Sequence, residues 1–161
     1  MRSGAKRVLG LAIAIGALAG GGVASANDGS VRLTASLTGA QEVPPADPDG
    51  SGKAKVDVNV EAGEVCFDIK IDATGTPNRG HIHVGDAGVN GGIVVPFFEL
   101  RTTDAPATDP RNDEIEQGRI QDCVAADPAV LAQIVANPSG YYVNLHNARF
   151  PGGAIRCQLE N

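Results

Sequence analysis

Polar and apolar residues alternate through most of this chain, and this period of two constrains the fold more than any other feature. Residues 31–37 place Val, Leu, Ala and Leu on one side and Arg, Thr and Ser on the other, and residues 53–60 and 65–71 alternate in the same way. Successive side chains of a β-strand point to opposite faces of a sheet. The pattern therefore predicts strands that bury one face and leave the other polar.

Further strands are predicted at residues 80–84, 93–100, 118–120, 141–146 and 154–159. Pro96 indicates that its strand lies at an edge or carries a bulge, because proline has no amide hydrogen to donate. One helix is predicted at residues 128–136, where Asp127 is a suitable N-cap and Pro128 suits the first turn. About seven to eight short strands and one short helix predict an all-β fold, an antiparallel Greek-key β-sandwich.

The first 26 residues have the layout of a secretory signal peptide. A basic start precedes an apolar run at residues 8–19, and small residues at 24–26 form a cleavage site. The run is too short to span a bilayer comfortably, and no second apolar run follows it. We therefore expect a secreted protein whose mature domain, residues 27–161, has no membrane span.

The charge of the expected mature domain restricts its partners. Without the leader, which holds three of the 13 basic residues and no acidic one, 10 basic residues face 19 acidic ones, a net charge of −9. Such a surface disfavours nucleic acid and anionic membranes, but it does not repel metal cations. Trp is absent, so a stacking platform for bases or sugars is not expected. The partner is expected to be an extracellular ligand or protein that the sequence does not identify.

Strand parity selects a disulfide among the three cysteines. Cys66 points away from the apolar face of its strand, whereas Cys157 shares the apolar face of its strand with Ile155 and Leu159. An exported protein with three cysteines is expected to hold one disulfide and one thiol. We predict a bridge between Cys66 and Cys123, with Cys157 buried and inert.

All three histidines lie on the polar sides of two predicted strands. His81 and His83 are two residues apart and share a face, and His146 shares its face with Tyr142 and Asn144. Imidazole is the commonest protein ligand for zinc and copper. If the two strands are neighbours, the three rings can hold one copper or zinc ion at the surface of the domain, outside the apolar core.

Other polar residues complete this candidate site in two alternative ways. Glu42, in a proline-stiffened loop, is a candidate carboxylate partner, and Asn144, Asn147 and Arg156 are candidates for orienting the rings. In the alternative, the histidines form a hydrogen-bonded network with these residues and bind no metal. The chain has no Gly-x-Ser-x-Gly motif for a serine nucleophile, and nothing in it identifies a substrate.

Four segments of the chain carry a family resemblance. They are LTGAQEVPP at residues 37–45, GHIHVG at 80–85, YYVNLHN at 141–147 and PGGAIRCQL at 151–159. In this order they resemble the CHRD (chordin) domain family, in its secreted bacterial type. The resemblance implies an exported all-β domain that serves in binding or extracellular interaction, without a general catalytic activity. The family often has Gly at the position of Cys157, which implies that this thiol is unpaired.

A weaker resemblance concerns the histidines alone. The pair His81 and His83 on one strand, followed by His146 at the end of a later strand, is similar to the copper site of copper-zinc superoxide dismutases. Those enzymes use four copper histidines and further zinc ligands, whereas this chain has three histidines in all. A non-enzymatic binding module is therefore the first hypothesis. The alternative is a metal-dependent oxidoreductase distantly similar to superoxide dismutase.

Overall fold

Eight antiparallel strands form one sheet in residues 29–99 and 117–161, which are the residues that this computed structural model describes. The order across the sheet is β5-β4-β7-β8-β1-β2-β3-β6. The strands are β1 (Val31–Thr38), β2 (Ser51–Asn59), β3 (Glu64–Asp72), β4 (Pro77–Val84), β5 (Ile93–Glu99), β6 (Arg119–Ala125), β7 (Tyr141–Asn147) and β8 (Ile155–Gln158). The predicted signal peptide, residues 1–26, lies outside the described residues.

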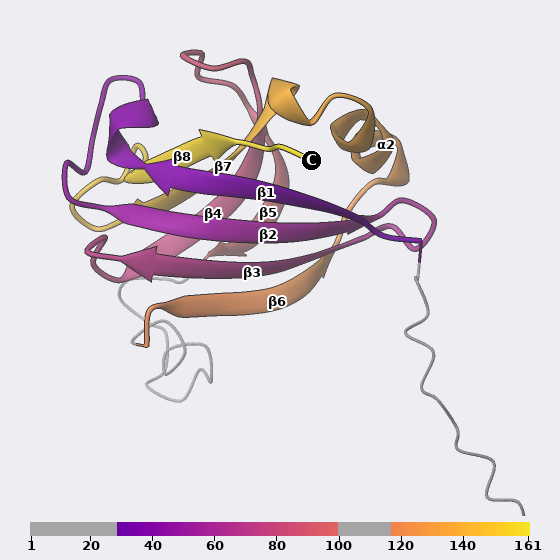
Figure 1. Cartoon of the computed structure of the whole chain (residues 1–161), viewed down its shortest axis with the longest axis horizontal. Helices are drawn as coiled ribbons and strands as arrows, with labels where there is room; N and C mark the ends of the chain where they lie inside the picture. Colours follow the sequence, from indigo (N-terminus) through magenta and orange to yellow (C-terminus); the bar gives the residue numbers. More distant parts are fainter. Residues whose placement is uncertain (1–28, 100–116) are drawn as a thin grey trace, which may run out of the picture.

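The sheet curves so that its two halves face each other across the core. In Figure 1, β1, β2, β3 and β6 lie in front of β4, β5 and β7. Phe67 of β3 stacks on Phe97 of β5 with ring centroids 4.3 Å apart, so the two halves are in direct contact. The two layers of the predicted sandwich are therefore halves of one continuous sheet, and the prediction of an antiparallel all-β fold is confirmed.

The two halves are joined where the ends of the domain meet. The short strand β8 pairs with β7 on one side and with β1 on the other, through Thr38 and Arg156. A second contact between the chain ends is a bridge between Thr34 and Glu160. These pairings place Arg156 of β8 next to β7, and they bring the loop after β1 close to Arg156.

Pro96 lies both at an edge and at an irregularity, as predicted. Strand β5 is the terminal strand of the sheet, and its pairing with β4 shifts register twice, on either side of the His81–Ile82 pair. The irregularity leaves both Phe97 and Phe98 buried, although they are consecutive in the strand. A bulge of this kind redirects side chains locally, and here it lies beside the histidine strand β4.

The predicted helix at residues 128–136 is confirmed. Helix α2 (Pro128–Ala136) begins at Asp127, whose Oδ1 accepts a hydrogen bond of 2.8 Å from the amide of Ala129. Two 3-10 turns, η1 (Gly39–Gln41) and η2 (Pro138–Gly140), complete the described helical elements. None of the described helices has the length and apolar character needed to cross a membrane.

The predicted cysteine pairing is confirmed. Cys66 of β3 and Cys123 of β6 lie directly opposite each other, with their sulfur atoms 2.04 Å apart. The bridge ties β6, the last strand in the described sheet, to its neighbour β3. Cys157 is a free thiol buried in the apolar core, as its strand parity predicted.

Candidate metal centre

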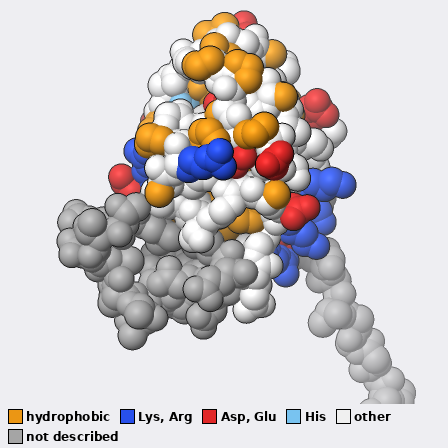
Figure 2. All heavy atoms as spheres, turned by 90° about the vertical axis from the view of Figure 1, so that its left-hand side faces the viewer, with side chains coloured by type: hydrophobic (Ala, Val, Ile, Leu, Met, Phe, Trp, Pro, Cys, Tyr) orange, Lys and Arg blue, Asp and Glu red, His pale blue; other side chains and the backbone are white. Residues whose placement is uncertain are grey.

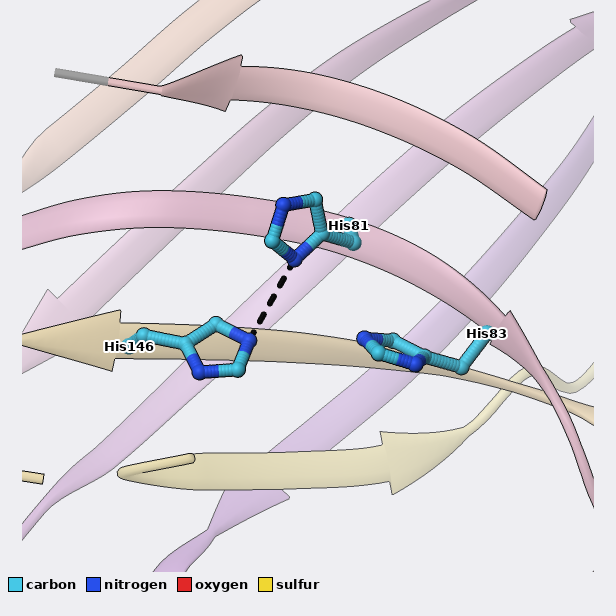
Figure 3. Close-up of side chains that lie close together, drawn as sticks. All are labelled: His81, His83 and His146. Carbon is cyan, nitrogen blue, oxygen red and sulfur yellow. Dashed lines mark hydrogen bonds between the residues drawn. The ribbon is translucent and has the colours of Figure 1, made fainter. Parts of the chain in front are cut away.

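The histidines come from two strands that are neighbours in the sheet, as predicted. Strands β4 and β7 pair so that His81 lies opposite Asn144 and His83 lies opposite Tyr142. Ile82 and Val143 alternate with them and point into the core. Because parity is kept on both strands, His81, His83 and His146 all project from the outer face. Figure 3 shows the three rings directed toward one another.

The ring nitrogens are close enough for one ion. One nitrogen from each histidine lies within 4.8 Å of the other two, and His81 Nδ1 is 3.3 Å from His146 Nε2. A metal–nitrogen bond of about 2 Å places two bound nitrogens at most about 4 Å apart. Side-chain movements of about 1 Å therefore bring the set to coordination distance.

The other nitrogen of two of these rings is held by the backbone. His83 Nδ1 lies 3.0 Å from the carbonyl oxygen of Gly91, and His146 Nδ1 lies 3.1 Å from that of Pro151. A carbonyl oxygen only accepts, so each Nδ1 carries the hydrogen and each Nε2 presents its lone pair to the cluster. His81 Nδ1 then donates to His146 Nε2, while His83 Nε2 is buried and has no hydrogen-bond partner among the described residues.

The histidines are buried, and the expectation of a surface site is wrong in this respect. His81, His83 and His146 are 5 %, 8 % and 6 % exposed. On the face drawn in Figure 2, only a small area of histidine is visible between other side chains. The outer face of β4 and β7 is covered because residues 85–92 fold over it, with Gly91 in contact with His83. The site is therefore outside the apolar core but inside the protein.

Burial also changes the protonation of the rings. Loss of solvent lowers the pKa of His81 to about 4, helped by the positive charge that His146, His83 and Arg79 would place nearby. The pKa of His146 is lowered to about 4, again chiefly by burial and against the effect of its bond to Pro151. The pKa of His83 is also lowered by burial. At neutral pH the rings are uncharged, which is the form that binds metal.

Arg156 is a fully buried charge beside this cluster. Its Nε donates to the carbonyl of Gln41 at 2.7 Å, and its Nη1 donates to Asn90 Oδ1 at 2.9 Å. Its Cζ lies 4.5 Å from the centre of the Tyr142 ring, and His83 stacks on that same ring at 4.9 Å. Tyr142 stands on the strand between those of Arg156 and His83, so the three side chains form a column across β8, β7 and β4.

Glu42 is placed near Arg156 and not among the histidine nitrogens. It is 5 % exposed, and its Oε1 has no hydrogen-bond partner in the part of the chain that the structure describes. Burial raises the pKa of Glu42 to about 7, opposed by the charge of Arg156. Gly153 makes room for the carboxylate, since a Cβ there would lie 2.7 Å from both carboxylate oxygens. In the described residues, the close group of donor atoms at this site consists of the three histidines alone.

The two asparagines have different positions. Asn144 is buried between His81 and Arg156 in the register of the sheet, and within residues 29–99 and 117–161 its Oδ1 has no hydrogen-bond partner. Asn147 donates to the carbonyl of Thr74 and accepts from the amide of Phe150, so it ties two loops together. Among the hydrogen bonds of residues 29–99 and 117–161, the histidine rings bond to each other and to loop carbonyls, and not to Glu42, Asn144 or Arg156.

Residues 89–91 contribute contacts that sequence reasoning did not identify. The amide of Gly91 donates to the Tyr142 hydroxyl at 3.1 Å, and Asn90 Nδ2 donates to the carbonyl of Val43 at 2.7 Å. Asn90 thus connects the loop after β4 to the loop after β1 and to Arg156. The loop has no periodic pattern, so the sequence carried no signal for these contacts. Tyr142 was predicted to share the face of His146, but its stacking with His83 was not predicted.

Comparison with known proteins identifies the domain. The model of the CHRD domain family matches residues 33–159, which include the three histidines, Glu42 and Arg156. No curated protein and no solved structure matches the chain. The family supports a non-enzymatic extracellular module, and the disulfide is consistent with an extracellular protein. Since the match spans most of the chain, this protein belongs to the CHRD domain family.

Proposed function

We propose that this protein is a secreted, non-enzymatic binding module that holds one copper or zinc ion with His81, His83 and His146. The observation that carries the proposal is the convergence of one nitrogen from each of three uncharged rings within 4.8 Å, together with a buried His83 Nε2 that has no hydrogen-bond partner in the described residues. Leaving a buried polar atom unsatisfied costs about 1–3 kcal/mol. A bound ion supplies the missing partner.

The hydrogen bonds of the rings support binding by preparing them as ligands. Metal-binding histidines usually donate their second nitrogen to a carbonyl or carboxylate, which fixes the tautomer and the ring orientation. His83 and His146 do this through Gly91 and Pro151. In the alternative without metal, the rings would bond to Glu42, Asn144 or Arg156, and such bonds are not found in the described residues. The bond within the cluster, from His81 Nδ1 to His146 Nε2, has to break before both of these rings can bind an ion.

The test is metal analysis of the protein purified without a histidine tag. We expect one copper or zinc ion per chain, and we expect His83→Ala to lose it. Val84→Ala is the matched control, because Val84 follows on the same strand and its side chain is 42 % exposed, so this variant should keep the metal. Failure to retain either metal, with no shift in Tm when copper or zinc is added, would overturn the proposal.

A superoxide assay on the same samples separates the module from the alternative oxidoreductase. The chain has three histidines, and in the described residues the cluster has no further donor. We expect copper-loaded protein to consume superoxide no faster than the His83→Ala variant. Catalytic turnover that depends on His83 would instead support a metal-dependent oxidoreductase.

A further inference from the structure

We infer that the histidine cluster selects copper in its monovalent state, Cu(I), over Zn(II) and Cu(II). This inference rests on the proposed function and specifies the ion that the same site binds. It follows from three observations: burial of a ligand set without anionic donors, two guanidinium groups beside the ligands, and three protein donors in place of four.

The first observation is the absence of negative charge among the ligands. The donor atoms that lie close together at this site are imidazole nitrogens, and the rings are 5–8 % exposed. Moving an ion out of water has a free-energy cost that rises with the square of its charge, so a divalent ion costs about four times as much as a monovalent ion of the same size. Neutral ligands leave the full charge of the ion uncompensated. This favours the ion of lower charge.

The second observation is that two guanidinium groups lie beside the ligands. The first is that of Arg79, which bonds to the same carbonyl oxygen as His146. The Nη2 atom of Arg79 donates to the carbonyl oxygen of Pro151 at 2.7 Å, and His146 Nδ1 bonds to that same oxygen at 3.1 Å. A positive charge is therefore held two hydrogen bonds from a ligand nitrogen. Its repulsion of a bound ion is twice as large for a divalent ion as for a monovalent one.

Arg156 places a second guanidinium on the other side of the cluster. Its Cζ is 4.5 Å from the centre of the Tyr142 ring, and the ring of His83 is stacked on Tyr142 at 4.9 Å. Glu42 interacts electrostatically with this guanidinium and offsets part of its charge when ionised. Within residues 29–99 and 117–161, the ion pairs involve Arg32 and Arg119, and not Arg79 or Arg156. The field at the cluster is therefore positive.

The third observation is the number of donors. Structural zinc sites are almost always four-coordinate and tetrahedral, and Cu(II) prefers tetragonal surroundings. Cu(I) has a filled d shell and forms stable trigonal complexes with three nitrogen donors. The ring of Tyr142 stacks on His83, and its hydroxyl, the nearby oxygen that could act as a fourth donor, already accepts a hydrogen bond from the amide of Gly91. Three histidines thus complete a Cu(I) site, whereas Zn(II) would need a water as its fourth ligand and Cu(II) would need further ligands. The rings are 5–8 % exposed, so a bound water would have to be held in a buried site.

The test compares the affinities of the whole protein for each ion. Cu(I) is supplied without oxygen and competed with a colorimetric Cu(I) chelator, and Zn(II) and Cu(II) are titrated against their own indicators. We expect Cu(I) to bind about 100-fold more tightly than Zn(II), a difference of about 2.7 kcal/mol. X-ray absorption of the Cu(I) form should report three nitrogen neighbours. Bound copper should be reduced more readily than copper in water.

Arg79 allows the charge argument to be tested separately. Arg79→Gln removes the charge and should raise the affinity for Zn(II) more than that for Cu(I), whereas Arg79→Lys keeps the charge and should retain the preference. Arg32→Gln, on β1, is the control for loss of a guanidinium elsewhere and should change neither affinity.

The outcomes distinguish this inference from the proposed function. If Zn(II) or Cu(II) binds as tightly as Cu(I), the proposed selectivity is wrong, but the proposed function as a metal-binding module is still supported. Binding of none of the three ions overturns both. An unchanged preference in Arg79→Gln, with Cu(I) still favoured, would overturn the role given to that guanidinium.

Discussion

His83 and Tyr142 are stacked face to face, with ring centroids 4.9 Å apart and planes inclined by 7°. The same tyrosine ring carries the guanidinium of Arg156, whose Cζ lies 4.5 Å from its centre. Tyr142 therefore fixes the plane of one candidate ligand and separates it from a buried positive charge. Its hydroxyl also accepts the amide hydrogen of Gly91, whose carbonyl holds His83.

Tyr142 contributes a stacked ring and a hydrogen-bonding hydroxyl, and two substitutions should separate these contributions. Tyr142→Phe keeps the stacked ring and loses one hydrogen bond, so it should lower the free energy of unfolding by about 1 kcal/mol and keep the bound metal. Tyr142→Leu removes the aromatic face for His83 and Arg156 and should cost about 2–3 kcal/mol. Urea unfolding and metal titration of both variants check this. Equal effects of the two substitutions would contradict the role of the ring.

Asn90 is predicted to control how fast metal leaves the site. Its side chain donates to the carbonyl of Val43 and accepts from Arg156, so it ties residues 85–92 over the histidines. Asn90→Ala removes both bonds and should speed metal release to a chelator by about tenfold, which corresponds to about 1.4 kcal/mol. Val89→Ala is a control in the same loop, because Val89 is 51 % exposed. Stopped-flow release at equal rates in the two variants would rule out this role.

The metal-free protein should show two opposing pH dependences of stability. Burial lowers the pKa of His81 and His146 from 6.5 to about 4. Their contribution to stability is complete above pH 6.5 and is lost as the pH falls toward 4. Burial raises the pKa of Glu42 from 4.5 to about 7, so its contribution is complete below pH 4.5 and is lost as the pH rises through 7.

Glu42→Gln separates the two effects. It removes the opposing contribution, so the free energy of unfolding of the variant should rise more steeply with pH between 4.5 and 6.5 than that of the unmodified protein. Glu61→Gln is the control, because Glu61 is exposed in the turn between β2 and β3. Urea unfolding at intervals between pH 4 and 7.5 measures the slopes. Parallel curves for Glu42→Gln and the unmodified protein would show that Glu42 is not perturbed by burial.

Two adjacent glycines offer a matched pair of substitutions. Gly153 has φ +142°, and a Cβ there would lie 2.7 Å from the Glu42 carboxylate, whereas a Cβ at Gly152 would meet nothing within 4 Å. Gly153→Ala should lower the free energy of unfolding by about 1–3 kcal/mol through backbone strain, with the displaced carboxylate adding to the loss. Gly152→Ala should change stability little. Thermal unfolding of the two variants tests this, and similar Tm values would contradict it.

Local patterns were sufficient for predicting that the strands and the helix exist, but β4 and β6 are longer than predicted and the two 3-10 turns were not predicted. The alternation at residues 31–37 predicted β1, which spans Val31–Thr38, and capping by Asp127 predicted the bounds of α2. Parity also distinguished Cys66, which is bridged to Cys123, from the buried thiol of Cys157. These predictions succeeded because the direction of a side chain on a strand depends only on its position in that strand.

Contacts between segments that are distant in the sequence could not be predicted from local patterns. Asn90 and Val43 are 47 residues apart, and Arg156 and Gln41 are 115 residues apart. The sequence placed Glu42 and Arg156 with the histidines as candidates, but it did not show that the rings bond to Gly91 and Pro151. Loops without a repeating pattern carry no local signal of the surface on which they pack.

The sequence by itself determined that the chain is an antiparallel all-β domain and that three histidines share its polar face, because both follow from a period of two. Only the tertiary structure decided that this face is buried and that the sheet is continuous through Thr38 and Arg156. It also decided that two guanidiniums lie beside the rings. The physical reason is that burial and electrostatic environment arise from segments that meet only when the whole chain has folded.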